Sequence, residues 1–225
     1  MRTRRGFLNS AAVAGVGIAG ASVAGTFGIG VAEAAGTPAE DSAAILNMAT
    51  LAETLAVTFY YTVLTGAAFH IDAPAVESLT LTMDAEMRHL QTLRSLGGRS
   101  RRQHFYLPDR MLSDASVFVD TGLRVEAAVV GAYLAATHQF AALGQPLLAA
   151  TAARHAASEA QHLTLLGHLA GLPPRDLAPP ALVFQRVSDA ALALAPFLAG
   201  GGGFGELARF PSAHRYQAAR GASDS

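Results

Sequence analysis

The chain carries the same short motif twice, and each copy has a further glutamate at a fixed distance upstream. The motif is Glu-x-x-His, at residues 86–89 and again at residues 159–162. Glu53 precedes the first copy at the same spacing as Glu126 precedes the second (86 − 53 = 33 and 159 − 126 = 33). The two halves therefore superimpose at a single offset (126 − 53 = 73). A repeat that supplies two carboxylates and one imidazole per copy indicates a metal site.

The spacing inside the motif shows how these side chains can converge. Positions i and i+3 of an α-helix lie on one face, so each Glu-x-x-His directs a carboxylate and an imidazole the same way. Two helices with a lone Glu and two with the motif can direct all six groups at one point inside a bundle. Carboxylate and imidazole together suit iron or manganese. Buried carboxylates are costly alone, and two divalent cations would cancel the four negative charges. The predicted ligands are Glu53, Glu86, His89, Glu126, Glu159 and His162.

Three more polar residues are candidates for contact with these ligands. Tyr60 and Tyr133 occupy equivalent positions in the two halves (133 − 60 = 73), each about two turns after its lone glutamate. Either hydroxyl could hydrogen-bond a ligand carboxylate or act as a redox group; the simpler alternative is core packing with a satisfied hydroxyl. His155 lies one turn before Glu159 on the same face. It is a candidate neighbour of the ligands or of the path by which metal enters.

Four helices are predicted to position these residues. Gly97 and Gly98 end the second helix, and Asp72 is a candidate cap at its start. A short turn at residues 144–146 indicates that the third and fourth helices are antiparallel neighbours. The irregular, basic stretch 97–113 can span on the order of 55 Å, enough to cross the length of a bundle. We interpret it as a solvated connection, and we expect no nucleic-acid binding. The predicted helices cover residues 42–65, 72–96, 116–143 and 146–169.

These residues resemble the ferritin-like di-metal carboxylate superfamily, which includes ferritins, bacterioferritins, rubrerythrins and manganese catalases. The six predicted ligands match its motif over about residues 40–171, with a spacing most similar to that of bacterioferritin. The resemblance implies an all-α fold, a ferritin-like four-helix bundle with a long crossover between helices 2 and 3. It implies that Glu86 and Glu159 bridge two metal ions. Glu53 and Glu126 would then each bind a single one of the two metal ions. Among exported relatives, the chain looks most like the desiccation-related ferritin-like proteins.

Composition excludes several alternatives. The chain is 51% hydrophobic and 15% charged, with a net charge of −1, which offers no basic surface for nucleic acid. It has no cysteine, so disulfides, thiolate zinc sites, iron–sulfur clusters and a rubredoxin-type centre are excluded within this chain. A self-contained rubrerythrin is therefore excluded. Met87 stands where bacterioferritins bind haem through methionine at a two-fold dimer. We do not expect this chain to bind haem. A homodimer is compatible with the sequence.

The N-terminal segment, residues 1–34, is predicted to be a twin-arginine signal peptide. Arg4-Arg5-Gly6-Phe7-Leu8 is the twin-arginine pattern, an Ala/Gly-rich stretch follows to about residue 31, and Ala32-Glu33-Ala34 is a small-x-small cleavage site. This predicts export by the twin-arginine translocase to the periplasm or the cell exterior. A retained membrane anchor is the alternative.

Two further segments follow the signal peptide. The ferritin-like bundle is predicted over residues 35–172, and a C-terminal extension over residues 173–225. In the extension, residues 187–198 are a candidate short apolar helix interrupted by Pro196. The polar tail from residue 213 is predicted to be disordered.

Together these patterns predict an exported protein that binds two iron ions per chain, or two manganese ions instead. It would oxidise Fe(II) with O2 or H2O2, in metal handling or in oxidative or desiccation stress. One alternative is a manganese catalase-like or peroxidase enzyme. Another is a non-catalytic, stress-associated structural protein whose metal site is vestigial or serves folding.

Overall fold

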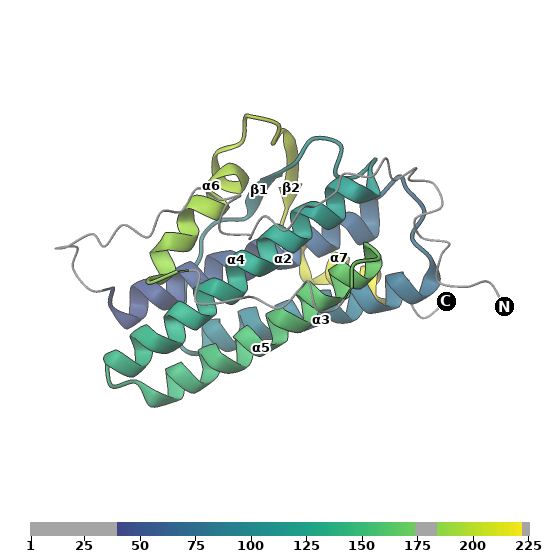
Figure 1. The fold of residues 1–225 in the computed structure, drawn as a ribbon. Coiled ribbons are helices and arrows are strands. Elements are labelled where there is room, and N and C mark those ends of the chain that lie inside the picture. Colours follow the sequence, from purple (N-terminus) through teal and green to yellow (C-terminus); the bar gives the residue numbers. More distant parts are fainter. Residues whose placement is uncertain (1–39, 174–183, 222–225) are drawn as a thin grey trace.

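Four long helices pack side by side in the computed structural model, which describes residues 40–173 and 184–221 (Figure 1). Each boundary lies within one residue of the prediction, and the predicted all-α four-helix bundle is confirmed. The predicted signal peptide lies outside the described residues. The helices are α2 (Ser42–Gly66), α3 (Ala73–Ser95), α4 (Ala115–Ala142) and α5 (Pro146–Leu169).

Aspartates begin three of these helices. Asp41, Asp72 and Asp114 each accept a hydrogen bond from a backbone N–H in the first turn, at 2.7–3.0 Å. Such caps satisfy donors that have no partner inside the helix. The predicted cap at Asp72 is thereby confirmed. Helix α5 begins instead with Pro146, which has no N–H to satisfy.

The four helices form two hairpins that enclose a shared apolar core. Helix α2 packs along α3, and α4 packs along α5. Phe59 of α2 stacks on Phe118 of α4, with ring centroids 5.4 Å apart. Among the described residues, α2 is the one helix long and apolar enough to cross a bilayer, and 67% of its apolar window is buried in the protein. Helix α2 therefore has the burial of a core helix.

Helix α3 ends in a turn that brings the chain against α2. Gly97 adopts a φ of 100°, and the N–H of Gly98 donates to the carbonyl of Leu93 at 2.9 Å. This is the Schellman arrangement that ends many helices. A Cβ at Gly98 would lie 2.2 Å from the Thr50 hydroxyl and 3.0 Å from the carbonyl oxygen of Leu46. The close approach therefore requires glycine at residue 98.

The long crossover between α3 and α4 is not only a solvated connection. It contains strand β1 (His104–Leu107), in which Phe105 and Leu107 are fully buried. Strand β1 pairs antiparallel with β2 (Glu206–Arg209), so that Phe105 faces Ala208. Figure 1 shows this ribbon and helix α6 along one side of the bundle. The expectation of a solvated stretch was wrong because the strand is short and its partner lies far away in the sequence.

The C-terminal extension folds back on the bundle. A 3-10 turn, η3 (Val187–Ala190), leads into α6 (Ala191–Ala199), which agrees with the predicted short helix. The predicted disorder is wrong for residues 213–221, which form α7 (Ala213–Gly221); residues 222–225 lie outside the described residues.

A single carboxylate of α3 receives two side chains of α7. The buried Tyr216 hydroxyl donates to one oxygen of Asp84 at 2.5 Å, and Arg220 lies 2.8 Å from the other oxygen. Apart from Tyr216 the helix buries no residue. Hydrophobic periodicity therefore gave no signal for α7.

Candidate metal centre

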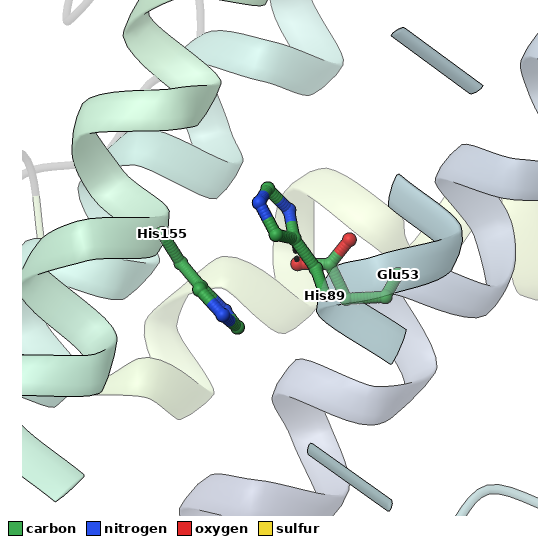
Figure 2. A group of neighbouring side chains, drawn as sticks. All are labelled: Glu53, His89 and His155. Atoms are coloured by element: carbon green, nitrogen blue, oxygen red, sulfur yellow. Dashed lines mark ion pairs between the residues drawn. The ribbon is translucent and has the colours of Figure 1, made fainter. Parts of the chain in front are cut away.

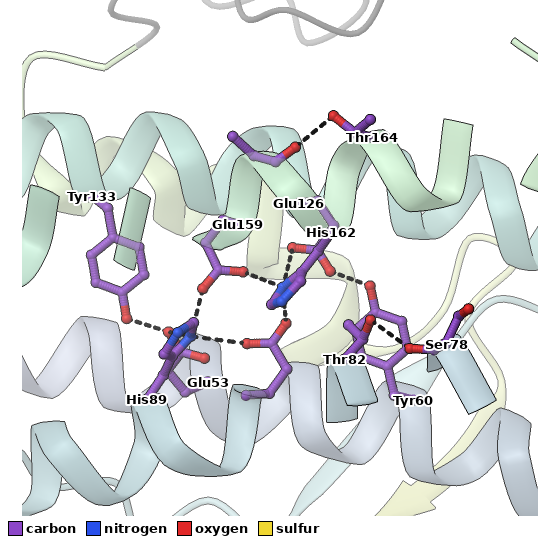
Figure 3. Close-up of polar contacts among 12 residues, drawn as sticks. Glu53, Tyr60, Ser78, Thr82, His89, Glu126, Tyr133, Glu159, His162 and Thr164 are labelled. Atoms are coloured by element: carbon purple, nitrogen blue, oxygen red, sulfur yellow. Dashed lines mark hydrogen bonds and ion pairs between the residues drawn. The ribbon is translucent and has the colours of Figure 1, made fainter. Parts of the chain in front are cut away.

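All six predicted ligands lie together inside the bundle. Figure 3 labels all of them except Glu86. Each long helix contributes to the group, and α3 and α5 contribute two residues each. The four carboxylates are at most 1% exposed, and the two imidazoles are 9% and 6% exposed. Because buried carboxylates need compensation, this burial indicates a site built for cations. The residues are Glu53 of α2, Glu86 and His89 of α3, Glu126 of α4, and Glu159 and His162 of α5.

The six residues form two overlapping groups. One consists of Glu53, Glu86, His89 and Glu159, and the other of Glu86, Glu126, Glu159 and His162. Within each group, one donor atom per residue lies within 4.8 Å of the others. Both groups contain Glu86 and Glu159. The arrangement therefore offers two adjacent cation positions with two carboxylates in common.

The two imidazoles each approach the glutamate of the opposite motif most closely. His89 Nδ1 lies 2.7 Å from an oxygen of Glu159, compared with 3.4 Å from Glu86 in its own motif. His162 Nδ1 lies 2.8 Å from Glu86, compared with 3.0 Å from Glu159 in its own motif. The shared carboxylates thus connect the α2–α3 hairpin to the α4–α5 hairpin.

Several of the donor atoms have no hydrogen-bond partner among the described residues. His89 Nδ1 approaches three carboxylates yet forms a hydrogen bond with none. Buried polar atoms without partners are rare in folded proteins, and each one calls for an explanation. Donor atoms that converge from four helices in this way suit bound cations, so this donor set could hold metal ions. The unpartnered atoms of the six residues are Glu53 Oε2, both oxygens of Glu86, His89 Nδ1, Glu126 Oε2 and Glu159 Oε1.

Without a cation, protons gather on this cluster. Burial, reinforced by the charge of Glu86, raises the pKa of Glu53 to about 7 and that of Glu126 well above its usual value. Burial alone would lower the pKa of His89, but its carboxylate contacts, first with Glu159, outweigh that effect and raise it to about 12. The pKa of His162 rises to about 11 for the same reasons. Metal binding must therefore displace protons.

Each of the two repeat-related tyrosines donates its hydroxyl to a glutamate of the other half. Tyr60 on α2 donates to Glu126 on α4, and Tyr133 on α4 donates to Glu53 on α2 (Figure 3). Burial, with the neighbouring carboxylate charges, raises the pKa of both hydroxyls well above the usual value. Seven residues, about 10.5 Å of helix, separate each tyrosine from the lone glutamate on its own helix. The sequence alone did not indicate that these hydrogen bonds cross from one half to the other.

His155 also lies against the cluster, as Figure 2 shows. Its ring stacks on His89 with centroids 4.2 Å apart, and it meets the ring of Tyr133 edge-on at 5.1 Å. Burial and the adjacent charge of His89 lower the pKa of His155 to about 3, so its ring is neutral near neutral pH. Together with Glu53 and His89 it forms a third group of donor atoms within 4.8 Å of one another.

The chain was compared with known protein families and proteins. Residues 41–172 match the family described as the ferritin-like domain. The match covers 132 of the 225 residues (172 − 41 + 1 = 132) and includes every residue of the cluster. No curated protein and no solved structure matches the chain.

Proposed function

The chain belongs to the ferritin-like family, and we propose that its buried cluster binds two iron ions and promotes oxidation of Fe(II) by O2 or H2O2. The observation that supports this proposal most directly is the pair of overlapping donor groups with Glu86 and Glu159 in common. A site for one cation would need only one such group. Two groups with shared carboxylates suit two ions side by side.

The proposal gives each residue a role. Glu53 and His89 would hold one ion, and Glu126 and His162 the other. Glu86 and Glu159 would bridge them. When bound, two iron ions supply two electrons together, so that 2 Fe(II), O2 and 2 H+ give 2 Fe(III) and H2O2.

The residues around the ligands prepare the site for this chemistry. The four carboxylates favour the more highly charged Fe(III) over Fe(II). The hydroxyls of Tyr60 and Tyr133 fix one oxygen each of Glu126 and Glu53, which leaves the other oxygen of each carboxylate for metal. The apolar bundle around the cluster excludes water and keeps the ligands in place.

Stopped-flow absorbance after mixing metal-free protein with Fe(II) in air tests the proposal. We expect a fast phase that consumes about two Fe(II) per chain, because the cluster has two positions. His89→Ala and His162→Ala should each slow that phase strongly, since each removes an imidazole ligand. Met87→Leu is the control, because Met87 packs on the core next to Glu86 and belongs to none of the donor groups. An oxidation rate equal to that of buffer alone would rule out the proposed activity.

Manganese gives a second candidate activity, because carboxylate and imidazole donors suit manganese as well as iron. The manganese form would then break down H2O2. Rapid O2 release from H2O2 by the manganese-loaded protein, without Fe(II) oxidation above the buffer rate, would favour this alternative. A metal-dependent rise in melting temperature with neither activity would instead indicate a structural site.

Export is a separate part of the proposal. We propose that the twin-arginine translocase moves the chain to the periplasm or the cell exterior after folding, so that metal can be loaded before copper or zinc competes for the site. Replacing both Arg4 and Arg5 by Lys should leave a precursor inside the cell. Normal secretion of that variant would show that another pathway exports the protein.

A further inference from the structure

The two halves of the cluster differ at one position. At the offset that relates the halves, His155 on α5 corresponds to Thr82 on α3 (155 − 73 = 82), whereas the six predicted ligands and both tyrosines obey the repeat. The Thr82 hydroxyl donates to the carbonyl of Ser78 at 3.0 Å, within its own helix (Figure 3). The imidazole of His155 therefore has no counterpart in the other half.

The ring of His155 is placed as a ligand would be. The residue is 6% exposed, and its buried Nδ1 has no hydrogen-bond partner among the described residues. A buried polar atom left without a partner costs about 1–3 kcal/mol. His155 lies one turn before Glu159 on α5, and a ring nitrogen of His155 lies within 4.8 Å of donor atoms of Glu53 and His89. A ring nitrogen of His155 is thus placed to bind the metal ion that Glu53 and His89 would hold, here called the Glu53–His89 position.

Neighbouring rings hold this imidazole in position. His89 stacks on one face at 4.2 Å with an interplanar angle of 25°, and Tyr133 packs edge-on at 88°. Tyr133 already donates its hydroxyl to Glu53, so that hydroxyl's proton does not serve His155. If packing were the whole role of His155, a phenyl ring of similar size would replace it without loss.

We propose that His155 is a seventh protein ligand of the di-metal centre and makes the Glu53–His89 position bind metal more tightly than the Glu126–His162 position. This inference rests on the proposed di-metal site. The first position then has two imidazoles and the second has one. A neutral imidazole adds a donor to the first position without adding charge. The affinities of the two positions are then unequal, and the two ions should load in sequence.

Titration of metal-free protein with Mn(II), with free Mn(II) measured by electron paramagnetic resonance, tests the inference independently of activity. The unmodified protein should bind in two steps of unequal affinity. His155→Phe keeps the stacked ring but removes both nitrogens, and it should weaken the tighter step by about tenfold or more while the weaker step stays unchanged. Thr82→Val is the matched control from the other half and should leave both steps unchanged.

A second variant separates ligand loss from damage to the fold. His155→Gly leaves room for a small ring, and added imidazole should restore its tighter step but should not affect His155→Phe. Unchanged affinities in His155→Phe, or equal losses in Thr82→Val, would overturn the seventh-ligand role and leave the di-metal proposal standing. Failure of the unmodified protein to bind Mn(II) or Fe(II) would instead overturn the di-metal proposal itself.

Discussion

The hydroxyls of Tyr60 and Tyr133 link the carboxylates of Glu126 and Glu53, respectively, to the opposite half of the chain. Each donates to one oxygen of a buried glutamate, and the remaining oxygen of that glutamate has no hydrogen-bond partner among the described residues. Outer hydrogen bonds of this kind orient metal ligands and adjust their basicity. The tyrosines should therefore influence metal affinity without binding metal.

Removing one hydroxyl should affect mainly one metal position. Tyr133→Phe leaves Glu53 without its donor, and Tyr60→Phe does the same to Glu126. We expect each variant to weaken Mn(II) binding by roughly 10- to 100-fold at the position served by its glutamate. Equilibrium titration with Mn(II) measures both steps. Tyr61→Phe is the control, because Tyr61 belongs to no donor group, and equal losses in all three variants would contradict a specific role.

The sequence predicted the site's composition better than its connections. The six predicted ligands could be identified because a motif repeated at equal spacing is visible in the sequence alone. The exchange of Tyr60 and Tyr133 between halves depends on how the hairpins dock, which local spacing does not encode. The stacking of His155 on His89 depends on the same docking. His155 was nevertheless recognisable as a candidate, because it lies one turn from Glu159.

At the scale of elements, the long helices were predictable and the short elements were not. Apolar residues at helical spacing, the candidate cap at Asp72 and the paired glycines 97 and 98 indicated α2 to α5 to within one residue. Strand β1 and helix α7 lack such local signals, because each is stabilised by a partner distant in the sequence. Leu107 of β1 pairs with Glu206, and Tyr216 of α7 bonds Asp84.

The turn after α3 gives a prediction about packing between elements. Gly98→Ala would place a methyl group against the Thr50 hydroxyl and the backbone carbonyls of Leu46 and Leu93, so α2 and α3 would have to separate. We expect a loss of about 1–3 kcal/mol in the free energy of unfolding, as is usual for overpacked sites. Urea unfolding measures this loss.

A second glycine provides the control for that measurement. A Cβ at Gly66, the last residue of α2, would meet only Leu112 at an ordinary 3.5 Å. Gly66→Ala should leave stability unchanged or raise it slightly, because alanine loses less backbone entropy than glycine in a helix. A Gly98→Ala variant as stable as Gly66→Ala would show that the close approach carries no energetic weight.

For the whole molecule, the cluster sets how stability depends on pH in the absence of metal. The pKa of His89 rises from 6.5 to about 12 on folding, and that of His162 to about 11. A raised pKa contributes stability that is fully present below 6.5 and is lost as the pH rises toward the folded value. The raised pKa of Glu53, about 7, acts in the same direction, whereas His155 acts oppositely only below 6.5.

The metal-free protein should therefore lose stability between pH 6.5 and about pH 10. Thermal melts followed by circular dichroism in the presence of a chelator measure this trend. The metal-loaded protein should show a flatter profile, because the imidazoles are then unprotonated and bound. A melting temperature of the metal-free form that is constant or rises over this range would contradict the protonation described for His89 and His162.

No single hairpin of the bundle contains a complete donor group. The group around Glu53 needs Glu159 from the second hairpin, and the group around Glu126 needs Glu86 from the first. Both tyrosine hydrogen bonds also cross from one hairpin to the other. If the proposed metal site is loaded, metal retention would act as a checkpoint on assembly, because a chain whose hairpins have not docked would lack a complete set of donors.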